Sequence, residues 1–455
     1  MSENLNMETI NALWSVFVEY ERYISLKNLK HDNDLAFEVL NKLHLIKERF
    51  ESIIIDETQD LTQLQIFTLV KLSKDMRIYF YGDSNQTINP TIFSLGKLNQ
   101  IIFKISNGVL KIDNPYILRK TYRASRGLVE YTNHLVDLRK KWIAYQGEEI
   151  DYHHEAFGED GEIRWATRVH QKDLIEYIIE KTLNNPNSII LVPNHKIKKF
   201  LLELKDIKDT NQNRIYTIYE AKGLEWDSVI LYKFVGSEIS KFIEMDEGKG
   251  EKSTFHRMIF NKYYVACTRA RRTTIIIEDK DNAERLESLF DSIHEVKDKS
   301  LVDNYFNNDI SPEAWFKEAI NLFAQFEYKK ARLSYEKSID YDSDRVFGLI
   351  EICNELEKAT TEHSYELNKE IILKLKEKNE HDHLLNYYQQ KGQRQNIKLM
   401  QMYKGEQLEK EEVLDILREV DLDSIDEELL MKSPFVNELF QKEEELKKEI
   451  RSVIK

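Results

Sequence analysis

The sequence predicts an α/β chain with mostly parallel sheets, followed by an α-helical C-terminal region. Over about the first 300 residues, short runs of apolar and often β-branched residues alternate with helical patterns. Such alternation indicates crossover connections between parallel strands. One run, at residues 53–55, ends abruptly in the acids Asp56 and Glu57. Beyond about residue 300 the strand patterns stop, Lys and Glu become dense, and helical periodicity continues to Lys455.

Composition sets the broad class of the protein. A length of 455 residues allows two or three domains with separate cores. The net charge of −14 means that nucleic-acid binding would need a local basic groove. The 2 cysteines are too few for a disulfide framework. The first residues lack the regions of a signal peptide, and no apolar run approaches the roughly 20 residues of a membrane span. We therefore expect a cytoplasmic protein without membrane contact.

Residues 7–50 are expected to form amphipathic helices, because apolar side chains recur at three- and four-residue spacing. Strands are expected at residues 53–55, 77–81, 188–192, 215–218, 228–232 and 273–277. A domain boundary is expected near residues 295–312, where Pro312 follows a polar stretch.

The acids Asp56 and Glu57 suggest a nucleotide site. A buried parallel strand can deliver carboxylates at its C-terminal edge. In nucleotide hydrolases one such acid holds Mg²⁺ and its neighbour orients the attacking water. The alternative is a buried strand followed by a polar helix cap.

Four further clusters carry candidate chemistry. After the second strand, Gly82 permits a sharp exit, and Gln86 offers an amide to a phosphate or a water. An ordinary turn is the alternative there. The other three clusters are rich in cations and stand at residues 118–125, 217–227 and 263–272. Arginine is suited to bracing a phosphoryl group, although surface ion pairs are the alternative interpretation.

In this order, the five clusters resemble motifs II to VI of the UvrD/Rep-type helicases of superfamily 1, over about residues 30–280. The resemblance implies two RecA-like domains built on parallel sheets. The first, at residues 1–115, would be partial, and the second, at residues 116–300, nearly complete. A helical domain would occupy residues 301–455.

The resemblance also implies roles for the matching residues. Asp56 would bind Mg²⁺, Glu57 would be the catalytic carboxylate, and Gln86 would sense the γ-phosphate of ATP. The remaining nucleotide contacts would come from the arginine fingers Arg123 and Arg269, with Glu225 near the ribose. Motif V would contact single-stranded DNA through Thr217, Tyr219 and Lys222. These helicases move 3′ to 5′ along their track, and the motifs do not exclude RNA.

The chain departs from this family at the phosphate-binding loop. No Gly-Lys-Ser or Gly-Lys-Thr occurs in the 455 residues. That loop normally cradles phosphates and supplies a lysine and a Mg²⁺-binding hydroxyl. We therefore expect the chain alone to bind ATP poorly. It would be the C-terminal motor portion of a longer helicase, one half of a split enzyme whose partner supplies the loop, or an inactive scaffold that binds nucleic acid or protein.

Two smaller features concern the track and the C-terminal region. Motif III lacks its usual base-stacking aromatic, and Phe93 is the nearest substitute. The motif V sequence at residues 217–225 resembles that of the tetratricopeptide- and ankyrin-repeat-associated branch of the superfamily. Trp315, Ala331 and Tyr335 have the spacing of a tetratricopeptide helix pair, although a generic helical bundle is the alternative. Such a region would bind a protein partner.

Overall fold

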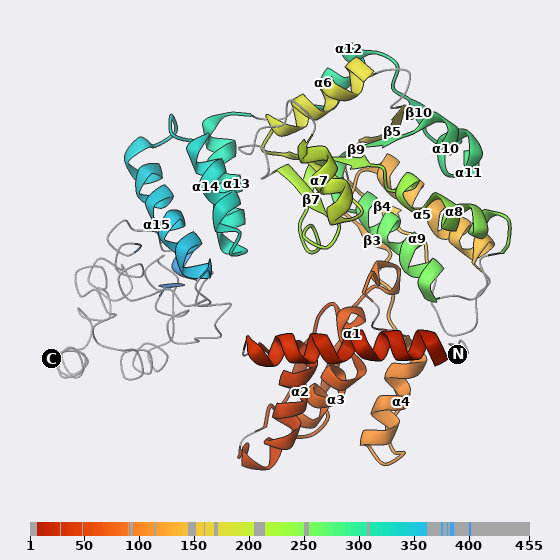
Figure 1. The fold of residues 1–455 in the computed structure, drawn as a ribbon, viewed down its shortest axis with the longest axis vertical. Helices are drawn as coiled ribbons and strands as arrows, with labels where there is room; N and C mark the ends of the chain where they lie inside the picture. The colour runs from red at the N-terminus through yellow and green to blue at the C-terminus, as the bar shows by residue number, and fades with distance from the viewer. Residues whose placement is uncertain are drawn as a thin grey trace. The chain divides into compact units, whose positions relative to one another are not determined.

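The computed structural model describes residues 7–27, 29–47, 49–89, 91, 94–112, 115–143, 152–158, 160–167, 172–203, 214–249, 254–306 and 310–361, with 375, 380, 383–385 and 400–401. The chain divides into two compact units, coloured by residue number in Figure 1. Unit 1 comprises residues 1–177, 190–197 and 217–302, and unit 2 comprises residues 178–189, 198–216 and 303–455.

The N-terminal segment of unit 1 is a two-stranded parallel sheet with helices. Its elements are α1 (Met7–Leu26), α2 (Asp32–Asn41), β1 (Ile53–Ile55), α3 (Gln63–Leu72), β2 (Ile78–Phe80) and α4 (Leu95–Ile105). Helices α3 and α4 form one core with Ile78 and Phe80 of β2. Ile54 and Tyr79, which pair in register, are 72% and 54% exposed. One face of this sheet is therefore covered, and these two side chains lie exposed.

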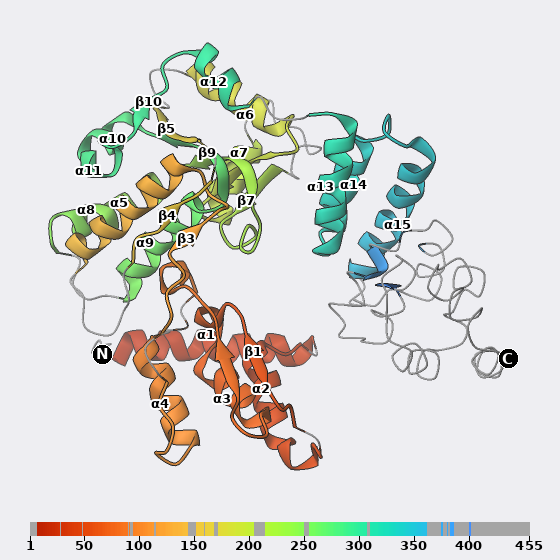
Figure 2. The same ribbon diagram turned by 180° about the vertical axis from the view of Figure 1, so that it is seen from behind.

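The helices expected within residues 7–50 are present as α1 and α2. Helix α1 contains no buried residue, however. Its apolar side chains Leu13, Val16 and Tyr20 are exposed. The apolar stripe that predicted this helix therefore does not face a core within the described residues. Figure 2 shows α1 as one long helix.

A six-stranded sheet forms the larger α/β assembly, in the order β10-β5-β9-β8-β6-β7. Its strands are β5 (Glu162–Thr167), β6 (Ser188–Val192), β7 (Ile215–Thr217), β8 (Trp226–Tyr232), β9 (Ala270–Glu278) and β10 (His294–Glu295), and a separate pair joins β3 (Lys120–Thr121) to β4 (Glu155–Ala156). The helices of this region are α5 (Arg126–Trp142), α6 (Lys172–Leu183), α7 (His195–Glu203), α8 (Ile239–Asp246), α9 (Thr254–Cys267), α10 (Lys280–Arg285), α11 (Glu287–Phe290) and α12 (Lys299–Tyr305).

The centre of this sheet is apolar on both faces. Strand β9 pairs in parallel with β8 and with β5. Residues 229–232 of β8 and 275–277 of β9 are buried, as expected for parallel strands covered by helices. Helices α5 and α9 pack on the sheet. The predicted α/β class with parallel sheets is confirmed.

The C-terminal region is helical as far as it is described. It contains α13 (Pro312–Ala324), α14 (Tyr328–Glu336) and α15 (Ser343–Thr361). Ser311 caps α13 by accepting a hydrogen bond from the Ala314 amide at 3.2 Å. Ala331 and Tyr335 are fully buried in the α13–α14 hairpin. The tetratricopeptide-like character of this region remains a prediction. None of the described helices combines the length and apolar character that a bilayer crossing requires.

Within unit 2, a buried arginine attaches α13 to the strands of the sheet. The side chain of Arg214, directly before β7, is 0% exposed. Its Nε donates to the Ser188 carbonyl at 2.9 Å and its Nη2 to the Pro186 carbonyl at 2.6 Å. Its Nη1 donates to the Glu318 carboxylate at 2.6 Å, and the guanidinium lies over the Trp315 ring. Because β7 leads into motif V, this attachment lies next to the candidate site in sequence.

We predict that Glu318→Ala lowers the free energy of unfolding by about 3 kcal/mol, because it removes the carboxylate partner of a buried guanidinium. The matched control is Glu313→Ala on the same helix, whose partner Lys317 is 69% exposed. That surface pair should contribute less than about 1 kcal/mol. Urea unfolding of both variants tests this, and equal losses would contradict the role given to Arg214.

Candidate nucleotide site

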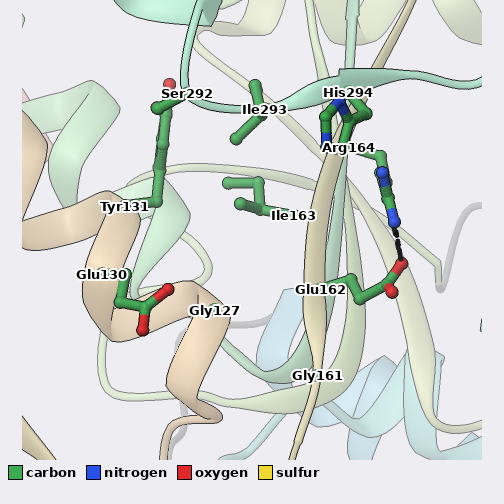
Figure 3. A pocket seen from close by; sticks show the side chains of 10 residues that line it. All are labelled: Gly127, Glu130, Tyr131, Gly161, Glu162, Ile163, Arg164, Ser292, Ile293 and His294. Carbon is green, nitrogen blue, oxygen red and sulfur yellow. Dashed lines mark hydrogen bonds and ion pairs between the residues drawn. The ribbon is translucent and has the colours of Figure 1, made fainter.

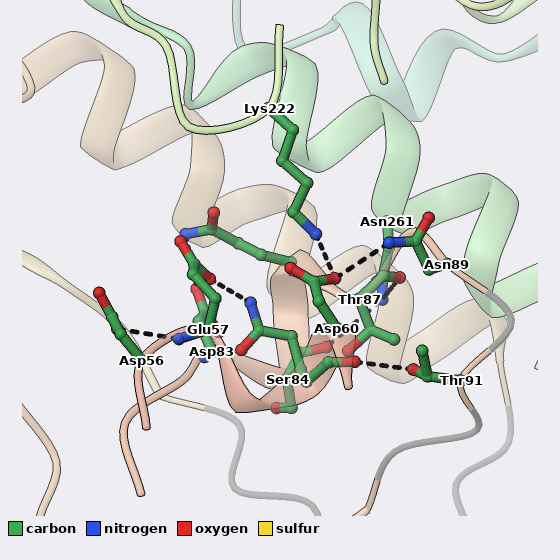
Figure 4. A network of polar contacts seen from close by, with 12 residues as sticks. Asp56, Glu57, Asp60, Asp83, Ser84, Thr87, Asn89, Thr91, Lys222 and Asn261 are labelled. Carbon is green, nitrogen blue, oxygen red and sulfur yellow. Dashed lines mark hydrogen bonds and ion pairs between the residues drawn. The ribbon is translucent and has the colours of Figure 1, made fainter. Parts of the chain in front are cut away.

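The two acids that follow β1 lie at the C-terminal edge of the small sheet. Glu57 adopts a left-handed backbone conformation, with φ of 48° and ψ of 40°. This conformation is uncommon for a residue other than glycine, and it turns the chain sharply away from the strand. Both side chains are exposed, and Asp56 Oδ1 accepts a hydrogen bond from the Glu57 amide at 2.9 Å. Two carboxylates are therefore presented side by side at the strand end (Figure 4).

Gln59 connects the acids to the loop that follows β2. Its side chain is fully buried, and its Nε2 donates to the Glu57 carboxylate. Its Oε1 accepts from the Asp83 amide at 3.1 Å. A Cβ atom at Gly82 would lie 2.5 Å from that Oε1. The absence of a side chain at Gly82 thus allows the close approach that positions Gln59 under Glu57.

Gln86 lies in the 3₁₀ turn η3 (Ser84–Gln86), which Asp83 organises. Asp83 Oδ1 accepts from the Asn85 amide at 2.9 Å, and Asp83 Oδ2 accepts from Gln86 Nε2 at 3.1 Å. The other end of the Gln86 carboxamide, Oε1, accepts from Arg269 Nη2 at 2.9 Å. A residue of motif III and a residue of motif VI are therefore in direct contact, although 183 positions separate them.

Arg269 follows α9 and is 4% exposed. Its Nε donates to the Val265 carbonyl at 3.2 Å, which fixes the side chain against its own helix. Burial lowers the pKa of Arg269, and the nearby positive charge of Arg123 adds to this, while Glu225 and Glu57 oppose it. Guanidinium groups nonetheless stay charged in proteins. Arg269 is thus a fixed cation between the acids of β1 and the turn that carries Gln86.

The second predicted finger, Arg123, forms an ion pair with Glu225 and is half-exposed. Glu225, predicted near the ribose, therefore lies beside the predicted finger Arg123. Next to Arg123 stands an exposed aromatic pair that the sequence did not single out. The rings of Tyr122 and Phe157 are 5.4 Å apart, and Tyr122 is 72% exposed. The exposed ring of Tyr122 offers a face on which a base can stack.

The residues of motif V lie in different environments. Thr217 is fully buried and holds a tight turn with Glu220, whose carboxylate accepts from the Thr217 amide at 2.6 Å. Tyr219 is 45% exposed, and the Lys262 ammonium lies 5.1 Å from its ring centre. Lys222 forms an ion pair with Asp60, the third acid of motif II. The structure thus connects motif V to motif II through Lys222.

Phe93, the predicted substitute for the base-stacking aromatic, lies outside the described residues. The DNA-binding roles of Thr217, Tyr219 and Lys222 stay predictions.

The side chains at the site fit a nucleotide with a divalent cation. Asp56 and Glu57 offer carboxylate oxygens, the ligands that Mg²⁺ prefers. Arg123 and Arg269 offer the donors that bind phosphate oxygens. Among the described residues, no group of three or more His, Cys, Asp or Glu could hold a metal ion. Mg²⁺ at nucleotide sites is typically bound by one or two carboxylates together with substrate phosphates, which is the arrangement that Asp56 and Glu57 suit.

A separate pocket of about 360 Å³ lies elsewhere in unit 1, between α5, β5 and β10 (Figure 3). Its polar lining includes Glu130, His294 and the ion pair of Arg164 with Glu162 at 2.8 Å. None of the residues that line it is a predicted site residue. The candidate nucleotide site is therefore not this pocket.

We predict that Gly82→Ala lowers the free energy of unfolding by about 1–3 kcal/mol, because the new methyl group displaces the buried Gln59 carboxamide. Urea unfolding measures the loss. If the clash with Gln59 is the cause, the same substitution made in a Gln59→Ala background should cost much less. An equal cost in both backgrounds would contradict this explanation.

Comparison with known proteins gives a consistent result. The UvrD/REP helicase N-terminal domain matches residues 3–89, and the UvrD-like helicase C-terminal domain matches residues 171–281. The human TPR and ankyrin repeat-containing protein 1 is 23% identical over 404 residues, which cover 74% of this chain and 13% of that protein.

Two helicases are also similar to the chain. An ATP-dependent helicase/nuclease subunit of Enterococcus faecalis is 26% identical over 203 residues, which cover 41% of this chain and 15% of that protein. The probable DNA helicase II homolog of Mycoplasma genitalium is 27% identical over 152 residues, which cover 31% of this chain and 20% of that protein. The chain thus spans no more than 20% of the length of any of these three relatives. Together with the ordered motifs, these matches support the similarity of the chain to the UvrD/Rep-type helicases of superfamily 1.

Proposed function

We propose that this chain is the motor portion of an ATP-dependent 3′–5′ DNA helicase or translocase, completed by a phosphate-binding loop from the same polypeptide or from a partner. The observation that supports this best is the contact of Arg269 Nη2 with Gln86 Oε1 at 2.9 Å. It joins a cation from motif VI to the turn beside the acids of β1. Such an assembly suits phosphoryl transfer, where catalysis consists mainly of positioning and charge stabilisation.

The roles of the side chains follow from their positions. Glu57, held by Gln59, would orient the attacking water at the strand end. Arg269 and Arg123 would stabilise the negative charge that develops on the transferred phosphoryl group. Asp56 would hold Mg²⁺, which would supply positive charge to the phosphates. The exposed acids and the fixed arginine lie on different segments, so relative motion of these segments would couple hydrolysis to movement on DNA.

The track is proposed from motif V and its surroundings. Lys222 connects this motif to Asp60, so a strand bound beside Tyr219 would influence the segment that carries the acids. The half-exposed Tyr219 ring with the Lys262 ammonium above it combines an aromatic surface with positive charge, as single-strand binding sites do. Hydrolysis assays with oligo(dT) and oligo(U) side by side distinguish a DNA track from an RNA track.

The second candidate is an inactive helicase-like scaffold. The observation that favours it is the exposed apolar surface of α1, which includes Trp14 at 64% and Phe17 at 48% exposure. Large exposed apolar patches are typical of binding surfaces. The two proposals differ in whether a chain supplied with the phosphate-binding loop hydrolyses ATP.

We predict that Glu57→Gln lowers DNA-stimulated ATP hydrolysis by about 10²-fold or more while nucleotide binding persists, because the amide cannot act as a base toward water. The assay uses the chain joined, ahead of its first residue, to the Gly-Lys-Thr loop segment of a UvrD-type helicase. Binding of a fluorescent ATP analogue serves as the control for folding. Full turnover in Glu57→Gln would reject the catalytic assignment, and no turnover in the unsubstituted protein would favour the scaffold.

We predict that Arg269→Ala lowers the same turnover by about 10³-fold or more, the scale of an arginine finger. Arg269→Lys retains the charge without the planar fork and should recover only part of the rate. The matched control is Arg285→Ala, because Arg285 is exposed and lies on α10. Equal rates for the Arg269 and Arg285 variants would show that Arg269 takes no part in hydrolysis.

A further inference from the structure

The turn that carries Gln86 is attached to α5 and α9 by side chains outside the helicase motifs. Arg139 of α5 donates from Nη2 to Asn85 Oδ1 at 2.6 Å and from Nη1 to Asn261 Oδ1 at 3.0 Å. Asn261 of α9 donates in turn from Nδ2 to the Thr87 carbonyl at 3.0 Å and to the Ser84 carbonyl at 3.4 Å. Figure 4 shows Asn261 beside Ser84 and Thr87. The turn is therefore held through one side chain and two backbone carbonyls.

These contacts are shielded from water. Asn85 is 0% exposed, Asn261 1% and Arg139 5%. Hydrogen bonds to a charged group are stronger than neutral ones, and burial raises the cost of breaking them. The attachment is thus part of the interior rather than a surface contact.

The Asn85 side chain contributes only its oxygen to the attachment. A guanidinium only donates, so the oxygen of the carboxamide must face Arg139. The Asn85 Nδ2 is buried and has no hydrogen-bond partner among the described residues. Only the oxygen of Asn85 is therefore used, and an aspartate could supply the same oxygen.

Asn261 lies in α9, which ends at Cys267, and Arg269 follows soon after this helix. Asn261 donates to a backbone carbonyl of the turn, and Arg269 donates to the side chain of Gln86. Two separate points of attachment fix the orientation of the turn, which one contact would leave free to rotate. A displacement of α9 would move both contacts together.

We propose that Arg139, Asn85 and Asn261 form a positioning clamp through which α5 and α9 hold the motif III turn, so that Gln86 meets Arg269. The clamp joins residues 84–87 to helices that pack on the larger sheet. Its role in catalysis rests on the proposed function, whereas its role in holding the two segments together does not.

The test uses a matched pair of variants of the full chain. Asn85→Asp keeps the oxygen that accepts from Arg139 and should preserve the clamp. The double variant Arg139→Met/Asn261→Leu removes every clamp contact from the two helices to the turn, and each replacement is an apolar side chain of similar size, which buried polar groups often tolerate. It should therefore fold without the clamp, as checked by circular dichroism and thermal unfolding.

The primary measurement is a distance distribution between spin labels at Lys74→Cys and Glu284→Cys, two exposed positions of unit 1. The native Cys267 and Cys353 are buried, which protects them from labelling. The double variant should broaden the distribution at least about twofold, and Asn85→Asp should leave it unchanged. A narrow distribution in the double variant, or equal broadening in Asn85→Asp, would overturn the clamp.

A second measurement addresses catalysis separately. In the chain supplied with the phosphate-binding loop, the double variant should lower kcat by about tenfold or more with little change in KM, because Gln86 is misplaced. Asn85→Asp should retain kcat within about twofold. A kcat unchanged in the double variant would overturn the catalytic role. An unsubstituted protein without turnover would instead reject the proposed function, while the distance measurement would still decide on the clamp.

Discussion

The candidate site is organised around one buried cation, the guanidinium of Arg269. A buried guanidinium cannot lose its charge, so acceptors must be brought to it. Two backbone carbonyls on its own side, those of Val265 and Leu224, satisfy part of this requirement. Arg269 Nη2 also donates to Thr268 Oγ1 at 3.2 Å and to the Gln86 carboxamide, which comes from the loop after β2. The same loop also donates from Asp83 to Gln59, which in turn donates to Glu57. The loop that supplies an acceptor to the buried arginine therefore also helps to position the acid.

Sequence patterns predicted β1, β2, β6, β7, β8 and β9, and they missed β5 and the two-residue strands β3, β4 and β10. The run at residues 188–192 is β6 with the same bounds, because an uninterrupted apolar run is typical of a strand covered on both faces. Strand β5 (Glu162–Thr167) carries Glu162 and Arg164, which pair with each other at 2.8 Å. It lies between β9 and the short edge strand β10, where one side of the strand is less enclosed. Charged residues near a sheet edge therefore concealed this strand.

The motif residues could be found from sequence because each motif is local, whereas their partners could not. Arg139 and Asn85 are 54 positions apart, and Lys222 and Asp60 are 162 positions apart. Only the fold brings such residues together, and no periodicity encodes the pairing. Lys222 illustrates the difference. Its motif suggests a DNA contact, but in the structure its ammonium is paired with a carboxylate, so a phosphate would have to compete with Asp60.

The exposed face of the small sheet and the missing phosphate-binding loop have one physical explanation under the proposed function. Parallel sheets are normally covered on both faces, and a two-stranded sheet alone is marginally stable. Ile54 and Tyr79 pair in register on the exposed face, and the strands that carry them end at Asp56 and at Gly82. A segment that covered these side chains would reach the same edge of the sheet as the acids. Under the proposed function, a segment that completed this core would also be placed to supply the lysine and hydroxyl that a nucleotide needs.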